Sequence, residues 1–532
     1  MHRVTKIIIF LLSFHCGCLA LKAQESTLKG RVVDSKTGTV IPFATILLKG
    51  QQGTFGVISN TDGDFQIPVS YKERIDTVII SCIGYTTKKF LIDLLLEDRI
   101  HIVRLVEAAL TLAEIEIRGS KGPRITAVNI VRSAIQSIPF NYPSSLGSYL
   151  AYYRDYQLRE NKYINLNEAI IEIFDEGFNA NDQLTTKMAL YDYKRNEKFE
   201  RDTTTEVVYD NHSTKFIPGA RLYHYGGNEL TILRVHDAIR NHQIGSYSFV
   251  NVMAKDFVKN HNFKLRKTIF RNEIPLYQIS FYSRESASGK SHLAKGNIYI
   301  EHDNYAIHKL EYTTYEIDEG EEKTLYDIHL EYTRGEASMI LNYLSFNNFF
   351  NLKDPRDFEV VDMFFNRDLN ALIVRFNKAP KLKLVTDVGN YAVTYRGKKQ
   401  LITAARLGDT VAGEPANSVY LYFFSYFFPK NSKAITEDLK ISFSNITDIE
   451  GRHVNDVHYI PVNQFREIFV QRATSPDRNV PDTLYVKKDM PLAASAIVEA
   501  ATPDSNYWMN TPLKSAPEKS FVELELLEKG YK

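Results

Sequence analysis

Short runs of β-branched and aromatic residues, each closed by turn residues, are the feature that most constrains the fold of this chain. They recur between residues 148 and 475, for example at 149–153, 168–174, 277–282, 297–301, 306–312 and 371–376. The chain also contains 32 Tyr and 31 Phe, which are residue types that pack well on a pleated surface. The sequence therefore predicts a mainly β protein with few helices, one of them near 229–242.

The first residues are typical of a secretory signal peptide. Arg3 and Lys6 precede an apolar run over 7–12, and small residues follow between Ala20 and Ala23. This order is the layout of an export signal, and the apolar run is too short to span a bilayer. We expect residues 1–23 to be removed and the mature protein to lie in the periplasm or at the outer membrane.

Charge and cysteine content restrict the partners and the source of stability. The formal net charge is +1, and it falls to about −2 without residues 1–23. That balance provides no electrostatic footprint for nucleic acid or for anionic lipid. Cys82 is the one cysteine that remains after cleavage, so stability has to come from buried cores rather than from an intramolecular disulfide.

The segment 27–118 has the pattern of a small β-sandwich. Strands are predicted at 28–34, 42–48, 65–67 and 76–83. Turn residues separate them, including Ser35–Gly38 and the Thr61–Asp64 sequence Thr-Asp-Gly-Asp. Several short strands at this spacing are typical of a sandwich.

These residues resemble the carboxypeptidase-regulatory-like domain. The motifs that carry the resemblance are Gly30-x-Val32-x-Asp34, Gly38, Pro42-x-Ala44-Thr45, Thr61-Asp62-Gly63-x-Phe65-x-Ile67 and Ser81-x-Ile83-Gly84-Tyr85. The resemblance implies a prealbumin-like, Ig-like β-sandwich on a Bacteroidota cell-envelope protein. It implies a role in folding or interaction and no peptidase activity.

A helix is predicted in the linker 119–145. Apolar residues share one helical face between Pro123, which begins the helix, and Pro139, which ends it: Ile125, Val128, Val131, Ala134, Ile135 and Ile138. We expect this face to pack on the sheet that follows, although a partner-binding helix has the same pattern.

A β-rich envelope domain is predicted over 146–475, followed by a tail over 476–532. Residues 297–307 resemble a hairpin of envelope proteins with curved, half-open sheets, such as lipoprotein carriers. The segments 138–143, 152–154 and 168–169 resemble an uncharacterised Bacteroidota envelope family. In the tail, the capping-box spacing at 515–518 predicts a C-terminal helix through Leu527.

Motifs for hydrolysis and phosphate binding are incomplete. The sequence has no His-Glu-x-x-His, and Gly245–Phe249 lacks the second Gly of a nucleophile elbow. The P-loop-like Ser288–Ser291 lacks the first Gly of that motif. Cys82 lies in an apolar strand, where a buried, inert thiol is expected.

Two acidic segments raise the question of a metal site. Glu301-His302-Asp303 is interpreted as a solvated turn, because only Glu301 and Asp303 share a face at strand spacing. The acids of 316–322 are interpreted as a hairpin tip, because an EF-hand needs flanking helices. We therefore predict no catalytic residue, no cofactor and no metal.

An aromatic segment over 419–428 is the candidate binding surface. One face of a strand here could line a groove for an apolar ligand or a partner, and the candidate residues are Tyr420, Tyr422, Phe423, Phe424 and Phe427. The sequence favours, over such a groove, a central strand buried on both faces, because aromatic residues supply much of the core area in sheets. The sequence favours a non-enzymatic binding or assembly protein, with an envelope protein or an apolar or glycan ligand as partner. A carrier of an apolar ligand in a curved sheet, or a hydrolase with a scattered site, are the alternatives.

Overall fold

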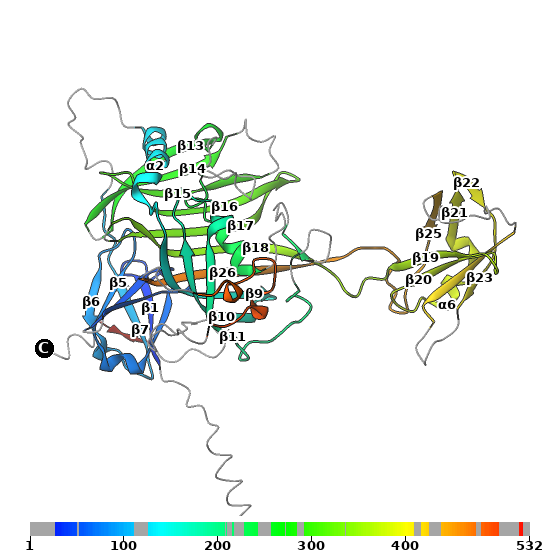
Figure 1. Cartoon of the computed structure of the whole chain (residues 1–532), viewed down its shortest axis with the longest axis horizontal. Coiled ribbons are helices and arrows are strands. Elements are labelled where there is room, and N and C mark those ends of the chain that lie inside the picture. Colours follow the sequence, from blue (N-terminus) through cyan, green and yellow to red (C-terminus); the bar gives the residue numbers. More distant parts are fainter. Residues whose placement is uncertain are drawn as a thin grey trace, which may run out of the picture. The chain divides into compact units, whose positions relative to one another are not determined.

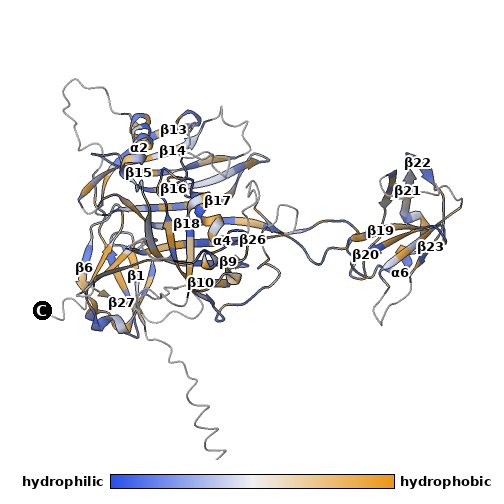
Figure 2. Ribbon diagram, viewed as in Figure 1, coloured by the Kyte–Doolittle hydropathy of each residue, from blue (hydrophilic) through white to orange (hydrophobic). Residues whose placement is uncertain are grey.

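The computed structural model of this chain divides into two compact units. Unit 1 comprises residues 1–211, 217–350 and 462–532, and unit 2 comprises 212–216 and 351–461. The structure describes residues 27–50, 53–110, 126–207, 209, 215–217, 228–242, 257–271, 273–284, 292–335, 337–408, 416–424, 438–474, 480–498 and 521–524. The chain is mainly β, as predicted, and apolar residues are interleaved with polar ones along the strands (Figures 1 and 2).

The N-terminal part of unit 1 is a sandwich of two four-stranded sheets. One sheet has the order β27 (Phe521–Glu523), β7 (Ile100–Leu105), β1 (Thr27–Asp34) and β4 (Asp64–Pro68). The other has the order β3 (Gly53–Ile58), β2 (Thr45–Gly50), β5 (Ile75–Ser81) and β6 (Lys88–Leu91). Short 3₁₀ turns follow β4 and β6, at Val69–Glu73 and Ile92–Leu94.

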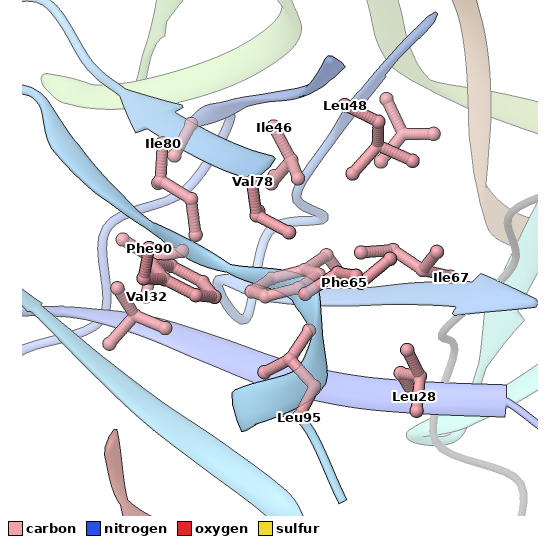
Figure 3. Close-up of a cluster of buried hydrophobic side chains, with 14 of the residues drawn as sticks. Leu28, Val32, Ile46, Leu48, Phe65, Ile67, Val78, Ile80, Phe90 and Leu95 are labelled. Atoms are coloured by element: carbon pink, nitrogen blue, oxygen red, sulfur yellow. The ribbon is translucent and has the colours of Figure 1, made fainter. Parts of the chain in front are cut away.

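The two sheets share one apolar core (Figure 3). Leu28, Ile46, Ile67, Val78 and Ile80 are fully buried in it, because alternate residues of each strand point inward. The predicted turn before β4 is confirmed: the Asn60 side chain accepts hydrogen bonds from two backbone N–H groups of that turn, each at 2.9 Å. Gly63 is required there, since its φ is +73° and a Cβ would lie 2.6 Å from the Val32 carbonyl oxygen.

The predicted C-terminal helix is wrong at Phe521–Glu523. Phe521–Glu523 form strand β27, which pairs in parallel with β7. Leu524 is fully buried in the sandwich core, and Glu523 forms an ion pair with Arg104. These long-range contacts outweigh the local capping-box pattern, since capping residues add only about 1 kcal/mol.

Unit 1 also contains a twelve-stranded sheet, antiparallel at each strand pair whose register is described. Its order is β11 (Lys187–Arg195), β10 (Lys162–Asp175), β9 (Gly147–Arg159), β26 (Tyr459–Thr474), β18 (Met339–Lys353), β17 (Glu321–Arg334), β16 (Ile307–Asp318), β15 (Leu293–Glu301), β14 (Ile274–Ser283), β13 (His261–Arg271) and β8 (Ala109–Leu110), with β12 (Lys215–Phe216) paired to β18. Neighbours in the sheet are mostly neighbours in sequence. The exceptions are β26, which returns late in the chain to lie between β9 and β18, and the two-residue strands β8 and β12, which pair with β13 and β18.

Short helices cover one face of this sheet. They are α2 (Ala127–Asn141), α3 (Asp182–Thr185), α4 (Glu229–Val235) and α5 (Phe257–Asn260). Helix α2 packs against β13 and β15, as expected of its apolar face. Pro139 lies inside the helix and does not end it, because a proline in the last turn removes only one backbone hydrogen bond.

The opposite face of the sheet packs against the N-terminal sandwich. The Phe43 ring stacks on Tyr343, with 4.9 Å between ring centroids, and contacts His329 at 5.0 Å. At the edge strand β11, the segment 480–498 adds backbone hydrogen bonds from Val486 to Met188 and from Val498 to Leu190. This segment therefore shields a sheet edge that would otherwise be open to another chain.

Unit 2 is a second, smaller sandwich that falls inside the predicted domain 146–475. One sheet has the order β19 (Val360–Asn366), β20 (Ala371–Phe376), β24 (Ser418–Phe423) and β23 (Ile402–Leu407). The other has the order β22 (Lys398–Gln400), β21 (Tyr391–Tyr395) and β25 (Leu439–Phe443), with α6 (Leu382–Val385) beside it in sequence. Phe358, Leu372, Val374, Phe376 and Leu421 are among its core residues.

In the parts of the chain that the structure describes, no helix combines the length and the apolar character needed to cross a membrane.

Candidate functional site

Strand β24 carries the predicted aromatic segment and separates it into two faces. Val419, Leu421 and Phe423 point into the core of unit 2, where Phe423 is 5% exposed. Tyr420 and Tyr422 point the other way and are half-buried. The strand is central in its sheet but fully buried on only one face, so the favoured prediction of burial on both faces is wrong at Tyr420 and Tyr422.

The neighbouring strands extend the outward face around the two tyrosines. Tyr420 lies directly opposite Ile373 of β20 and Arg406 of β23. Phe364 of β19 lies opposite Ile373 on its other side. Directly paired residues of antiparallel strands share a face, so these side chains form one surface. We call Phe364, Arg375, Arg406, Tyr420 and Tyr422 the aromatic face; Ile373 lies among them but is buried.

Two arginines belong to the aromatic face. The Arg406 guanidinium lies 5.5 Å from the centre of the Tyr422 ring, and the Arg375 guanidinium lies 6.0 Å from that of Phe364. Arg375 is also 3.6 Å from the Asp362 carboxylate. Such exposed cation–π contacts contribute about 0.5–1 kcal/mol each.

The structure brings together only some of the residues proposed from sequence. Tyr420 and Tyr422 lie on the aromatic face, Phe423 belongs to the core, and Phe424 is 77% exposed at the end of β24. Phe427 lies outside the described residues. Sequence reasoning missed Phe364, Arg375 and Arg406, because only strand register places them beside β24.

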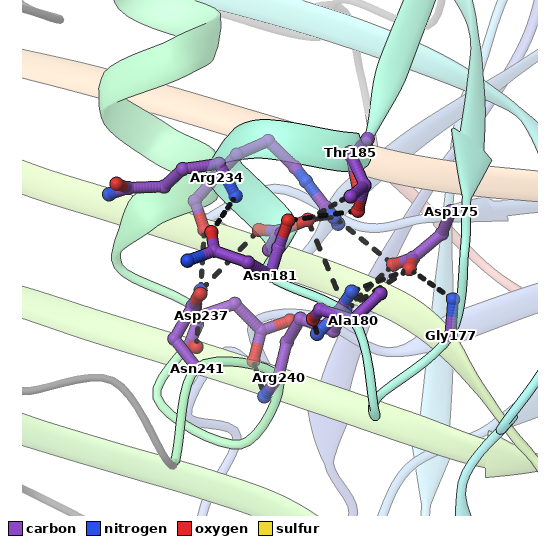
Figure 4. A network of polar contacts seen from close by, with 12 residues as sticks. Asp175, Gly177, Ala180, Asn181, Thr185, Arg234, Asp237, Arg240 and Asn241 are labelled. Atoms are coloured by element: carbon purple, nitrogen blue, oxygen red, sulfur yellow. Dashed lines mark hydrogen bonds and ion pairs between the residues drawn. The ribbon is translucent and has the colours of Figure 1, made fainter.

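A second polar cluster lies in unit 1, between α3, α4 and β10 (Figure 4). Arg234 of α4 donates hydrogen bonds to the Tyr149 hydroxyl at 2.6 Å and to the Asp182 carboxylate at 2.5 Å. Arg240 binds the Asp175 carboxylate through Nε and Nη2, with distances of 2.8–3.2 Å. We call these residues, with Asp237, the buried ion-pair cluster.

The carboxylates of the buried ion-pair cluster already accept hydrogen bonds from neighbouring side chains. Burial raises the pKa of Asp175, but Arg234 and Arg240 outweigh it and hold that pKa below its ordinary value. Burial raises the pKa of Asp237, which accepts a hydrogen bond from the Tyr332 hydroxyl at 2.6 Å. A carboxylate engaged in this way ties helix to sheet and is not a free base.

A small pocket adjoins this cluster. It is lined by Asp182, Gln183, Thr186, Met188, Thr231, Arg234, Val235 and Lys488. Its volume of about 20 Å³ is enough for a single water molecule. The pocket therefore has no room for a substrate in the structure as it stands.

The interpretation of Glu301-His302-Asp303 as a solvated turn needs correction at Glu301. This side chain is 2% exposed; it accepts a hydrogen bond from His308 Nε2 at 2.9 Å and is ion-paired with Arg334. The His302 ring stacks on Tyr277 with 3.7 Å between centroids. Among the described residues, no three His, Cys, Asp or Glu side chains are grouped as a metal site would require.

Of the remaining sequence motifs, Cys82 and the acids of 316–322 lie within the described residues and two others lie outside them. Burial raises the pKa of the Cys82 thiol to about 11, so the reactive thiolate is disfavoured. The acids of 316–322 surround the β16–β17 hairpin tip, where Glu319 and Gly320 are exposed with positive φ. The segments 245–249 and 288–291 are outside the described residues.

Comparison with known proteins identifies the first domain. Residues 28–117 match the CarboxypepD_reg-like domain, which confirms the resemblance found over 27–118. This is a regulatory, Ig-like domain and not a catalytic one. No curated protein matches the chain.

Two solved structures show only distant similarity. A LolA superfamily protein from Nitrosomonas europaea is 10% identical over 42% of this chain and 86% of its own, with a TM-score of 0.19. A Ca²⁺-stabilised adhesin that helps an Antarctic bacterium bind ice is 8% identical over 80% of this chain and 91% of its own, with a TM-score of 0.09. Superpositions this poor carry no inference about the fold.

Proposed function

We propose that this chain is a non-enzymatic binding or assembly protein of the bacterial cell envelope, which binds a protein partner through the aromatic face of unit 2. The observation that carries the proposal is the surface itself: two half-buried tyrosines and an exposed phenylalanine beside two arginines. Tyr, Phe and Arg are the residue types enriched in the centres of protein interfaces.

The charges of the aromatic face suggest the chemistry of the partner. Arg375 has the Asp362 carboxylate nearby, whereas Arg406 is exposed and lies on the Tyr422 ring. A partner with an apolar centre would cover the rings of the aromatic face. A carboxylate at the partner's rim would pair with Arg406, since a carboxylate binds a guanidinium in a bidentate manner. The proposed partner is therefore a protein surface with an acidic residue beside aliphatic or aromatic side chains.

The described residues of unit 1 give less support to a hydrolase with a scattered site or to a carrier of an apolar ligand. A hydrolase needs an accessible acid or base, but Asp175 and Asp182 are bound to arginines, and Asp237 accepts a hydrogen bond from Tyr332. Burial and the neighbouring Glu229 carboxylate raise the pKa of Asp155, yet that residue is 6% exposed and accepts hydrogen bonds from Tyr153 and Asn167. The pocket beside α4 has room for one water molecule, so this pocket would not hold the apolar ligand of a carrier.

A photo-crosslinking experiment in the native cells tests the partner site. We would replace Tyr422 by a photo-reactive phenylalanine analogue and, as a matched control, the exposed Lys398 on the other sheet of unit 2. We expect a discrete crosslinked protein from position 422 and none from position 398. We also expect Arg406→Glu to weaken the crosslink by roughly tenfold, because the cation that meets the partner's carboxylate becomes an anion.

Other results would overturn the proposal. Equal crosslinking at both positions would mean that the aromatic face is not a specific interface. Loss of the crosslink on adding soluble cell-surface glycan, with no effect of Arg406→Glu, would identify a glycan ligand instead.

The envelope location rests on the N-terminal signal and is tested separately. We expect N-terminal sequencing of the cellular protein to begin near Gln24, and we expect the protein in the envelope fraction. Retention of Met1 on cytoplasmic protein would contradict this part of the proposal.

A further inference from the structure

The outer edge of β7 in the N-terminal sandwich holds an extended segment from the other end of the chain. Strand β27 pairs in parallel with β7, with Phe521 opposite Ile100 and Glu523 opposite Ile102. More than 400 residues separate the two strands in sequence. An open edge strand is a ready template for another strand, and here a separate segment fills it.

Side chains on both faces of the sheet recognise this segment. On the outer face, the Arg31 guanidinium lies 4.7 Å from the centre of the Phe521 ring. On the same face, Arg104 binds Glu523 through two parallel hydrogen bonds, of 2.6 and 3.1 Å. On the inner face, Leu524 is fully buried in the sandwich core. The edge therefore selects an extended peptide with the pattern aromatic, half-buried aliphatic, acid, leucine.

We infer that the β7 edge is a strand-binding site whose ligand is the segment Phe521–Leu524, supplied either by the same chain, as seen here, or by a second copy of this chain. A second copy carries the same sequence and so makes the same contacts, which is why exchange of a terminal element is a low-cost route to dimers. The 22 residues between Val498 and Phe521 can span at most roughly 75 Å, enough to reach a neighbouring molecule. This inference does not depend on the aromatic face of unit 2.

A charge-swap experiment on the full-length chain tests the inference. The variants Arg104→Glu and Glu523→Arg each place like charges at the outer contact, so each alone should release its own strand. Mixed in equal amounts, each variant offers the strand that the other's edge requires. We expect a heterodimer by size-exclusion chromatography with light scattering, present in the mixture at least about tenfold above either variant alone.

The matched control carries both substitutions in one chain. It restores opposite charges within the molecule, and we expect it to behave like the unmodified protein. Circular dichroism checks that both single variants are folded. If they are folded and the mixture contains no more dimer than either variant alone, the exchange between copies is overturned.

A peptide experiment keeps the inference testable if the charge variants fold poorly. A labelled peptide with the sequence of residues 519–527 is added to the full-length variant Leu524→Asp, whose own strand cannot enter the core. We expect binding by fluorescence anisotropy, and binding about tenfold weaker for the peptide with Glu523→Arg. A folded Leu524→Asp protein that binds neither peptide would overturn the strand-binding site itself.

Discussion

Burial in this protein shifts the pKa values of single side chains in ways that their local sequence does not indicate. His236, which follows α4, stacks on Phe346 with 3.8 Å between ring centroids and hydrogen-bonds through Nδ1 to the Ile232 carbonyl oxygen at 2.7 Å. Burial lowers the pKa of His236 to about 4. The neutral ring is therefore the form that the fold accepts.

His236 should make the protein sensitive to mild acid. An unfolded histidine has a pKa near 6.5, above the folded value, so the stability contributed by the neutral ring is present above pH 6.5 and is lost as the pH falls towards 4. We predict that His236→Phe, which keeps the ring stack, makes the loss of stability between pH 6.5 and 4.5 shallower. Urea unfolding of both proteins at the two pH values measures this, and equal losses would contradict it.

Glu301 shows why residue-scale roles could not be read from sequence. Its local sequence, with His302 and Asp303, is that of a polar turn. Its partners are His308, seven residues away, and Arg334, 33 residues away on β17. Only the register of β15, β16 and β17 brings these groups together, and no local pattern encodes that register.

At the scale of elements, β24 is an apolar strand with two different faces. Local alternation predicted a strand with aromatic residues on both sides, and the structure assigns one side to the core of unit 2 and the other to the aromatic face. The sequence could not distinguish them, because tyrosine and phenylalanine suit both a core and an interface.

This division predicts opposite effects for neighbouring substitutions. Phe423→Ala removes a ring that is 5% exposed and should lower the free energy of unfolding of unit 2 by about 3–5 kcal/mol. Tyr420→Ala, at a half-buried outward position, should cost about 1 kcal/mol or less while weakening the crosslink at position 422. Calorimetry of the full-length chain, with crosslinking in parallel, measures both effects. Similar destabilisation by the two substitutions would show that the outward face is structural.

The N-terminal sandwich was the best-predicted element group, because its turn signals are local. Its strands at 28–34, 65–67 and 76–83 agree with β1, β4 and β5 within a few residues. Strand β27 was missed, because its pairing depends on a segment more than 400 residues away. Strands β3, β6 and β7 were also not predicted, so the sequence located four of the eight strands of the sandwich.

The missing strand gives a stability prediction for the isolated domain. We expect residues 27–118 to fold alone, as their sequence predicts, but to be less stable than the same segment fused through a flexible linker to residues 519–527. Burial of the Leu524 side chain alone should contribute about 1.5–3 kcal/mol. Thermal unfolding of both proteins tests this, with Leu524→Asp in the fusion as control. Equal melting temperatures for all three would mean that β27 adds nothing to the sandwich.

On the scale of the whole molecule, unit 2 is an insertion between two neighbouring strands of the large sheet. The chain leaves at the end of β18 and returns at the start of β26, which lies beside β18. The Asp354 N–H donates to the His458 carbonyl oxygen at 2.9 Å, so the two ends of the insertion are in direct contact. The prediction of one domain over 146–475 did not separate this unit, because strands of both units have the same alternating pattern.

The insertion should be removable. We predict that replacing residues 355–457 by a short Asn-Gly turn leaves unit 1 folded, with β18 and β26 joined as a hairpin. Residues 351–461 expressed alone should also unfold cooperatively, since they contain their own core. Circular dichroism and urea unfolding of each product measure this. Aggregation of the shortened chain, with a stable isolated unit 2, would show that unit 1 needs the insertion to fold.

The position of β27 in the sequence also delays completion of the N-terminal sandwich during synthesis. Strands β1 to β7 of the sandwich are made before the large sheet, yet the edge strand β27 lies 416 residues after the end of β7. At about 5–20 residues per second, the ribosome needs roughly 20–80 s to supply that strand. If the chain is exported unfolded, the same order applies as it emerges from the membrane: until residues 521–524 arrive, the β7 edge is exposed beside strands that could pair with it wrongly. The domain that begins folding earliest is thus the one that waits longest to finish, and it is the part of the nascent chain that most needs a chaperone.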